Sequence, residues 1–250
     1  IISPKGILDK IFPSFWRSKN IIKDLRKNKV DLYHGLSHEL PIGIEKTKIK
    51  TVVTIHDLIF LRFPNLFTKI DRKIYEKKFR NACENSDKIV AVSNQTKKDI
   101  INFFDVEEKK IEVIYQGCSK VFKSKRKSSE ISEVKNKFNL FENYLLYVGS
   151  IEERKNLMTL LHSLKDLQNK NLIIIGDGKN YKEKCIEYIK NNNLSKRVKI
   201  LSDLNLHEIS CIYQKADIMI YPSIFEGFGI PILEALNSKI PVITSKGGCF

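Results

Sequence analysis

The sequence has no run of about 18 uncharged apolar residues, so no segment of its 250 residues is predicted to cross a membrane as a helix. The densest apolar stretch, residues 218–236, is interrupted by prolines, glycines and two glutamates. The Lys-rich start is not followed by a clean apolar region and a small-residue cleavage site, so we expect no secretory signal peptide.

Cysteine is also scarce. The five cysteines are scattered along the chain and none forms a C-x-x-C pair. This spacing excludes a zinc ribbon and argues against a disulfide framework, so we expect a reducing, cytoplasmic environment.

Acidic residues are outnumbered: 29 Asp and Glu stand against 44 Lys and Arg, a formal net charge of +15. The excess permits nucleic acid, anionic lipid or a phosphorylated ligand as partner. A compositional bias that spreads lysine over solvated helix faces is the favoured explanation for most of the excess. Because no zinc module, RNP aromatic motif or helix-turn-helix signature is present, we expect no specific nucleic acid partner.

The length fits one large domain or two modest ones, and a hydrophobic content of 42% is ample for a core. The chain opens with Ile1 rather than Met and stops at Phe250, just past an apolar strand. We therefore treat it as a fragment that lacks a first βα unit and a last helix.

The first half contains short apolar segments that predict buried strands at residues 30–34, 50–55, 88–91 and 111–115. A helix is expected at 70–85, and Ser93 suits the N-cap of another. Residues 121–137 are polar, basic and Ser-rich with little apolar periodicity. We therefore predict an N-terminal domain at 1–120, a linker at 121–138 and a C-terminal domain at 139–250.

The second half alternates more cleanly between apolar strands and helices. Strands are expected at 144–149, 171–176, 198–201, 217–221 and 241–244, and helices at 156–167, 179–190, 206–214 and 230–236. Near-continuous apolar strands separated by helices indicate βα units and a parallel sheet covered on both faces. The fold class is therefore α/β, with two doubly wound, Rossmann-like domains.

The segment 221–234, YPSIFEGFGIPILE, falls on a strand-to-helix turn, where open α/β sheets bind ligands. Gly227 and Gly229 allow close backbone approach, and the helix start favours a phosphate. A carboxylate beside a diphosphate would be repelled, so Glu226 and Glu234 are candidates to accept hydrogen bonds from ligand hydroxyls. Alternatively, Glu234 complements the helix dipole and Glu226 is a solvated loop residue.

Two further turns follow strands. In YVGSIEERKN (147–156), Gly149 ends a strand, and Arg154 and Lys155 are placed to neutralise a diphosphate. Alternatively, the charges at 152–155 pair with one another in solvent. Gly176 begins a bare G-x-G after the next strand. This is a weak signal for a binding site, and a tight turn that leaves the strand is the favoured interpretation.

These segments, together with LIIIGDGKN, IPVITSKGG, VDLYHGLSHELP, VVTIHDLIF, SDKIVAVSNQTKKDI and IEVIYQGC, resemble the family 4 retaining glycosyltransferases. The resemblance covers nearly the whole chain, and FEGFGIPILEAL matches the E-x7-E element of that family. It implies the GT-B fold, with two domains facing a cleft, a nucleotide sugar on the second domain and an acceptor entering from the first.

The resemblance also implies roles for particular residues. Glu226 would contact donor sugar hydroxyls, Glu234 the nucleotide ribose, and Arg154 and Lys155 the departing diphosphate. The donor site would also include Gly149, Gly176, Gly227, Phe228, Gly229 and Ile230, with the amides of the last four on phosphate oxygens. Ser150 stands where many relatives carry Arg, so Arg154 would substitute only in part. The family's glycine-rich loop after the first strand is absent.

Three histidines lie at predicted strand ends: His34, His38 and His56. Relatives use a cleft histidine near the acceptor, and spacing leaves His38 and His56 both open as catalytic candidates. Asp57, beside His56, is a candidate to orient it. His162 and His207 fall on predicted helices, where we expect surface or packing roles.

No pair of aspartates is spaced D-x-D, the pair with which glycosyltransferases of the other common fold hold a divalent metal. We therefore expect no metal and no cofactor beyond the nucleotide diphosphate sugar donor. The hypothesis is a retaining transferase that acts on a glycan or lipid-linked acceptor in polysaccharide synthesis, peripheral on the inner membrane face through anionic lipid. A non-catalytic sugar-nucleotide-binding module and, less favoured, a basic nucleic-acid-binding protein are the alternatives.

One geometric expectation underlies this reading. The turn at 226–234 should face Arg154 and Lys155 across a gap wide enough for a pyrophosphate.

Overall fold

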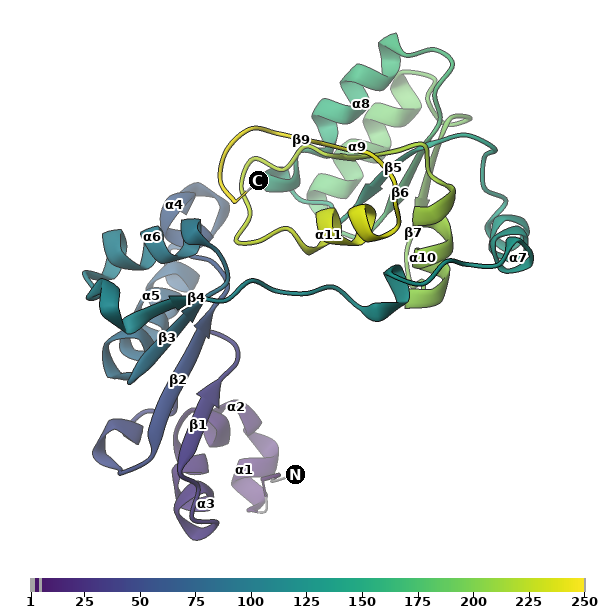
Figure 1. Cartoon of the computed structure of the whole chain (residues 1–250). Helices are drawn as coiled ribbons and strands as arrows, with labels where there is room; N and C mark the ends of the chain where they lie inside the picture. The colour runs from purple at the N-terminus through teal and green to yellow at the C-terminus, as the bar shows by residue number, and fades with distance from the viewer. Residues whose placement is uncertain (1–2, 5, 250) are drawn as a thin grey trace. The chain divides into compact units, whose positions relative to one another are not determined.

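The computed structural model of the chain describes residues 3–4 and 6–249, apart from the side chain of Leu8 (Figure 1). The chain divides into two compact units, and the division falls between Tyr115 and Gln116. We call the part up to Tyr115 unit 1 and the part from Gln116 unit 2. Each unit is built on one parallel β-sheet.

Within the described part of unit 1, the sheet has four parallel strands in the sequential order β1-β2-β3-β4. They are β1 (Leu32–Gly35), β2 (Lys50–Ile55), β3 (Lys88–Ala91) and β4 (Ile111–Val113). Alternate residues such as Val53, Ile55 and Ile89 are fully buried, whereas Val52 and Thr54 on the other face are only partly buried. One face of this sheet therefore carries the core of the unit.

The described helices of unit 1 are α1 (Ile7–Ile11), α2 (Pro13–Phe15), α3 (Ile21–Lys27), α4 (Ile59–Arg62), α5 (Lys69–Asn85) and α6 (Asn94–Phe104). Among them, α3 to α6 pack apolar side chains against that buried face, whereas Ile7, Ile11 and Phe15 of α1 and α2 are exposed. The Ser93 side chain accepts a hydrogen bond from the backbone N–H of Thr96, which confirms it as the N-cap of α6.

The sheet of unit 2 has five parallel strands in the order β7-β6-β5-β8-β9. They are β5 (Leu145–Val148), β6 (Leu172–Ile175), β7 (Val198–Leu201), β8 (Ile218–Tyr221) and β9 (Val242–Thr244). The winding direction therefore reverses between β5 and β8, as in the Rossmann arrangement.

Successive side chains along these strands point to opposite faces of the sheet and belong to two separate hydrophobic cores. Leu146 and Ile173 belong to one, and their neighbours Leu145 and Leu172 belong to the other. The four main helices are α8 (Leu157–Asp166), α9 (Asn180–Asn191), α10 (Leu206–Lys215) and α11 (Ile230–Asn237). Residues of α8 and α9 fill one core, and residues of α10 and α11 fill the other. The sheet is thus covered on both faces, and the α/β, doubly wound class is confirmed.

The segment 121–138, expected to be a linker, contains a helix and contributes to a core. Residues Ser128–Phe138 form helix α7, whose Val134 is buried, and Phe122 is 1% exposed in a core of unit 2. Ile131, Val134 and Phe138 recur at helical spacing and face that core, a pattern hidden among the serines and lysines. The segment therefore belongs to unit 2.

None of the helices in the described ranges combines the length and the apolar character that a bilayer crossing requires.

Candidate active site

Two loops of unit 2 meet at the point where the strand order reverses. After β5, Arg154 and Lys155 lie in a short 3-10 turn, Glu153–Lys155. After the neighbouring strand β8, the loop at 222–229 leads into α11. In open α/β sheets, the crevice outside the carboxyl ends of two such strands is the general position of a ligand site.

Glu226 lies in direct contact with both cations. Its Oε2 is 2.8 Å from Nη1 of Arg154, and its Oε1 is 2.5 Å from Nζ of Lys155. The expected gap for a pyrophosphate is therefore absent, because the carboxylate of Glu226 occupies the position between the cations and the turn. The three sequence-predicted residues are nevertheless brought together at one point.

The Glu226 carboxylate is buried, with 7% of the residue exposed, and Lys155 is 9% exposed. Its Oε1 also accepts hydrogen bonds from the hydroxyls of Ser223 at 2.7 Å and Tyr221 at 3.1 Å. Burial alone would raise the pKa of Glu226, but the charges of Lys155 and Arg154 outweigh it and the pKa is lowered. Glu226 is therefore an ionised, fully engaged carboxylate rather than a solvated loop residue.

The sequence reading did not single out Ser223 or treat Tyr221 as a partner of Glu226. Lys155 Nζ donates to the Tyr221 hydroxyl at 3.0 Å, so the tyrosine joins the lysine to the carboxylate. Burial raises the pKa of Tyr221 well above its usual value, which keeps this hydroxyl protonated. A polar side chain at the end of an apolar strand, in the run YPS, was the signal available in the sequence.

The two loops are also joined through their backbones. The N–H of Ile224 donates to the carbonyl of Arg154 at 2.9 Å, and Arg154 Nη1 donates to the carbonyl of Phe225 at 2.7 Å. Arg154 Nη2 lies 2.6 Å from Glu152, so part of the charge cluster at 152–155 does pair internally. These contacts hold the guanidinium in place before any ligand arrives.

Helix α11 starts as the sequence predicts. Gly229 is its N-cap with φ of 93°, a left-handed conformation that favours glycine, and Pro231 follows in the first turn. Gly229 has no side chain with which to cap the helix, so no side-chain cap hydrogen bond is made at this position. The amides at a helix N-terminus and the helix dipole are suited to phosphate oxygens, and the contact of the segment from Gly227 to Ile230 with phosphate stays a prediction.

Glu234 is the fifth residue of α11 and is partly buried. Its Oε2 accepts a hydrogen bond from the hydroxyl of Tyr213 on α10 at 2.9 Å. Burial raises the pKa of Glu234, and the Tyr213 hydrogen bond opposes that shift in part. Tyr213 positions this carboxylate, a role that the sequence reading missed because the two residues are 21 positions apart.

Gly149 and Gly176 serve the packing of neighbouring turns. A Cβ on Gly176 would lie 1.9 Å from the carbonyl oxygen of Gly149, and one on Gly178 would lie 2.2 Å from that of Ile151. Gly149 itself lies over the Lys155 side chain with φ of 150°. These contacts explain the G-x-G as a close approach of two turns, one of which carries Lys155.

The histidines of unit 1 divide into two groups. His34 Nε2 lies 2.8 Å from Thr54 Oγ1 and is exposed. His38 and His56 lie together, with ring centroids 4.9 Å apart, and the backbone N–H of His56 donates to Nδ1 of His38 at 3.3 Å. His56 Nε2 donates to the carbonyl of Leu36 at 2.9 Å. Asp57 Oδ1 accepts from the N–H of Ile59, so this oxygen caps the following turn.

His162 and His207 lie in α8 and α10 as expected: His162 is exposed beside Tyr188, and His207 Nε2 is 2.7 Å from Glu130. Within the described ranges, no three His, Cys, Asp or Glu side chains gather as metal ligands would.

Two protein-family models match the chain. The model of "Glycosyltransferase Family 4" matches residues 2–119, and that of "Glycosyl transferases group 1" matches residues 128–250. The first match lies almost wholly within unit 1 and the second lies within unit 2.

Similar proteins agree with these matches. The chain is 26% identical to an O-antigen chain mannosyltransferase B of Escherichia coli, with 89% of the chain and 58% of the relative covered. It is 29% identical to the O-antigen chain mannosyltransferase RfbU of Salmonella typhimurium, with 93% and 60% covered. It therefore spans about three fifths of these relatives. The structure of Anabaena HepE in complex with UDP-glucose aligns with a TM-score of 0.77 at 18% identity, over 100% of this chain and 67% of that one. This likeness shows the shared GT-B fold.

Proposed function

The chain belongs to the family 4 glycosyltransferases, and on this basis we propose that the protein transfers a sugar from a nucleotide diphosphate sugar to a glycan or lipid-linked acceptor in cell-envelope polysaccharide synthesis. Unit 2 would bind the donor and unit 1 the acceptor. The names of the O-antigen relatives support the polysaccharide pathway, and the UDP-glucose complex of HepE supports the class of donor.

The observation that carries this proposal is the buried group of Arg154, Lys155 and Glu226 beside the first amides of α11. It places two cations and a helix N-terminus at the topological switch point. These are the groups that a departing diphosphate needs, because they stabilise negative charge that develops as the bond to the sugar breaks.

Donor binding would rearrange this group. The diphosphate would take the place of the Glu226 carboxylate on the two cations, and Glu226 would then accept hydrogen bonds from hydroxyls of the sugar. Glu234, held by Tyr213, would accept hydrogen bonds from the ribose. The exchange replaces one anion by another on Arg154 and Lys155, so the buried cations keep a counter-charge throughout.

The reaction we propose is retaining and independent of a metal. The acceptor hydroxyl would attack the face from which the nucleotide leaves, and a donor phosphate oxygen would take its proton. Arg154, Lys155 and the amides from Gly227 to Ile230 would supply the charge stabilisation that a divalent cation supplies in other transferases. A transfer assay in excess EDTA tests the independence of a metal. NMR analysis of the anomer of the product tests the retention of configuration.

Thermal shift with UDP, GDP, ADP and their sugars on the full-length protein tests the donor proposal. One base should raise Tm selectively. The Glu234→Ala variant should lose that shift, and Glu187→Ala, at a helical glutamate away from the two loops, should keep it. A flat panel would contradict donor binding. A selective shift without transfer to any acceptor would favour the non-catalytic module.

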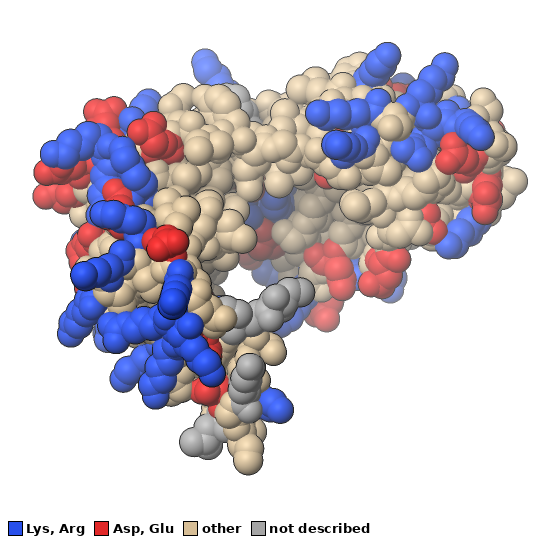
Figure 2. All heavy atoms as spheres, turned by 60° about the horizontal axis from the view of Figure 1, so that its bottom comes forward, with Lys and Arg blue, Asp and Glu red and all other residues tan. Residues whose placement is uncertain are grey.

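Peripheral membrane binding is proposed through helix α5. Ile70 and Ile74 are 72% and 47% exposed and share a helix face with Lys73 and Lys77. Exposed apolar side chains flanked by lysines are typical of helices that lie on anionic lipid. Unit 1 as a whole carries 23 Lys and Arg against 15 Asp and Glu. Figure 2 shows a broad group of Lys and Arg on the presented face of this unit.

Flotation with liposomes that contain anionic lipid tests this proposal. The protein should float with them, and the double variant Ile70→Ser/Ile74→Ser should float less. Protein that stays in solution with anionic liposomes would contradict it. Retention of DNA or RNA on filters should be weak and should fall steeply with salt, whereas tight retention at physiological salt would favour the nucleic-acid alternative.

A further inference from the structure

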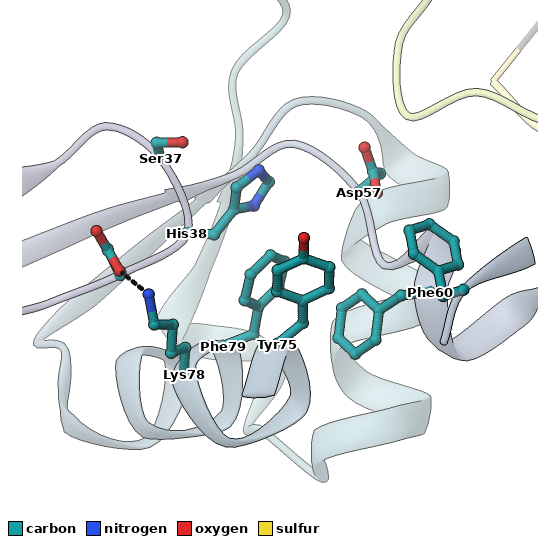
Figure 3. A pocket seen from close by; sticks show the side chains of 9 residues that line it. Ser37, His38, Asp57, Phe60, Tyr75, Lys78 and Phe79 are labelled. Atoms are coloured by element: carbon teal, nitrogen blue, oxygen red, sulfur yellow. Dashed lines mark hydrogen bonds and ion pairs between the residues drawn. The ribbon is translucent and has the colours of Figure 1, made fainter. Parts of the chain in front are cut away.

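Unit 1 contains a pocket lined mainly by aromatic rings (Figure 3). Its volume is about 320 Å³, at the lower end of the range for small-ligand sites. The lining residues are Ser37, His38, Glu39, Asp57, Phe60, Phe67, Tyr75, Lys78 and Phe79. A space of this size suits one small ring rather than an extended chain.

The aromatic wall is continuous and held in place by mutual packing. Phe60 lies edge-on to Phe79 with centroids 5.0 Å apart and edge-on to Tyr75 at 5.8 Å. His38 stacks on Phe79 at 4.4 Å. Phe60 is 3% exposed whereas Tyr75 is 38% exposed, so the wall runs from the core to the surface. Such a wall offers flat apolar faces whose positions do not depend on a ligand.

Polar groups stand around the same opening. Figure 3 shows the Asp57 carboxylate, the tip of Tyr75 and the ring of His38 bordering the space above the aromatic rings. His38 Nδ1 accepts the backbone N–H of His56, so the proton of the neutral ring is on Nε2. Burial, then the neighbouring His56, lowers the pKa of His38 to about 4, so the ring is neutral at physiological pH. The pocket thus combines a neutral donor with a carboxylate acceptor.

The charge of the lining argues against a phosphate as the occupant. Among the described residues that line the pocket, the one Lys or Arg is Lys78, and its Nζ lies 3.0 Å from Glu39 Oε2. Glu39 is also paired with Arg17 at 2.9 Å. A phosphate would meet the Asp57 carboxylate with no cation set aside for it.

We propose that this pocket binds a single pyranose ring, the terminal sugar of the acceptor glycan. The apolar C–H face of the ring would lie on Tyr75, and its hydroxyls would reach Asp57 and Nε2 of His38. A pyranose has this combination of one apolar face and a rim of hydroxyls, which a polyprenyl chain and a phosphate lack. The proposal rests on the proposed function, in which unit 1 binds the acceptor.

Saturation-transfer NMR on the full chain tests it, with methyl α- and β-pyranosides of glucose, galactose, mannose and N-acetylglucosamine as probes. At least one glycoside should bind. Tyr75→Ala should weaken it by about tenfold or more, because the flat face is lost. Asp57→Asn should also weaken glycoside binding. The amide oxygen of the asparagine can still accept the hydrogen bond from the N–H of Ile59, so the turn should be kept. Lys73→Ala, on the same helix outside the pocket, should bind as the wild type does.

Binding of nucleoside diphosphate to the same variants separates the two proposals. It should be unchanged by Tyr75→Ala and Asp57→Asn. If a nucleotide binds but no glycoside does, or if Tyr75→Ala and Asp57→Asn leave glycoside binding intact, the pocket proposal is overturned while the donor site stands. Binding of decyl phosphate that depends on Tyr75, without glycoside binding, would overturn it in favour of a lipid occupant. Circular dichroism confirms that each variant is folded.

Discussion

Arg154 and Glu226, separated by 71 residues of chain, form a largely buried ion pair whose Nη1 and Oε2 lie 2.8 Å apart. The same carboxylate reaches Lys155 through its other oxygen. The site thus carries its own anion on the two cations that a diphosphate would need. In the absence of ligand, this anion keeps both cations paired and in place, at the cost of competing with the donor.

This competition predicts an unusual result for Glu226→Gln. The variant should bind a nucleoside diphosphate without sugar more tightly than the wild type, by about tenfold, because a competing anion is removed and the net charge of the site rises. Transfer should fall by about a hundredfold or more, because the proposed contact with the sugar hydroxyls is weakened. Calorimetric titration of the nucleotide and a transfer assay check the two parts.

Glu152→Gln is the matched control for that variant. Glu152 also pairs with Arg154, but it does so through Nη2 rather than Nη1, and its side chain is exposed. We expect it to change nucleotide affinity much less than Glu226→Gln does. Unchanged or weaker nucleotide binding in Glu226→Gln would contradict the competition.

Lys155→Met should be strongly destabilising. It removes the ammonium from a buried carboxylate and from the Tyr221 hydroxyl while keeping the volume of the side chain. Breaking a buried pair by removing one partner costs about 3–5 kcal/mol, of which Arg154 can restore part. Urea unfolding should therefore show a clear loss, whereas Lys184→Met, at an exposed pair with Glu153, should stay within about 0.5 kcal/mol of the wild type. Equal stabilities for the two variants would contradict a buried role for Lys155.

The strands and the main helices could be predicted from the sequence because their signal is local. Apolar runs such as 50–55, 88–91 and 198–201 coincide with β2, β3 and β7. Helix α7 could not be found in this way, because the composition of 121–138 masks three apolar residues at helical spacing. The average composition of the segment therefore did not predict the helix, because the positions of a few apolar side chains decide how it packs.

The candidate site likewise has features that the sequence predicts and features that it does not. The sequence places Arg154 and Lys155 after one strand and Glu226 after another, and the strand order puts those strands side by side. It does not show that the three side chains would pair with one another. Nor does it indicate Tyr213 as the partner of Glu234, since that hydrogen bond joins two helices. Such contacts depend on side-chain directions that periodicity does not contain.

The buried state of His38 predicts a loss of stability in mild acid. Its pKa is about 4 in the folded protein and 6.5 in the unfolded chain, so the unfolded state binds the proton more tightly. The stabilisation is complete above pH 6.5 and is lost as the pH falls toward 4, which amounts to about 2 kcal/mol by pH 5. Groups around the ring include His56 and Glu39, of which His56 favours the neutral form and Glu39 the charged form.

Urea unfolding of the wild type and of His38→Asn at pH 7 and pH 5 measures this effect. Asparagine tolerates the left-handed backbone of His38, which has φ of 62°, and it does not titrate. The difference in stability between the two pH values should shrink by about 2 kcal/mol in His38→Asn. It should remain in His162→Asn, at an exposed histidine of α8. The same pH dependence in His38→Asn as in the wild type would show that another group is responsible.

The turn at Gly176 supports the final prediction, which separates a structural glycine from a binding one. A methyl group there would lie 1.9 Å from the carbonyl oxygen of Gly149, so backbone must move in the turn that leads to Lys155. Gly176→Ala should therefore lower the free energy of unfolding by about 2 kcal/mol or more. Gly117→Ala is the control, because a methyl group there meets no atom within 4 Å. The nucleotide affinity of Gly176→Ala should be measured well below its Tm. Any loss of affinity should be indirect, because it arises only from displacement of the turn that carries Lys155. A variant as stable as Gly117→Ala that nevertheless fails to bind nucleotide would instead assign Gly176 a direct contact with the ligand.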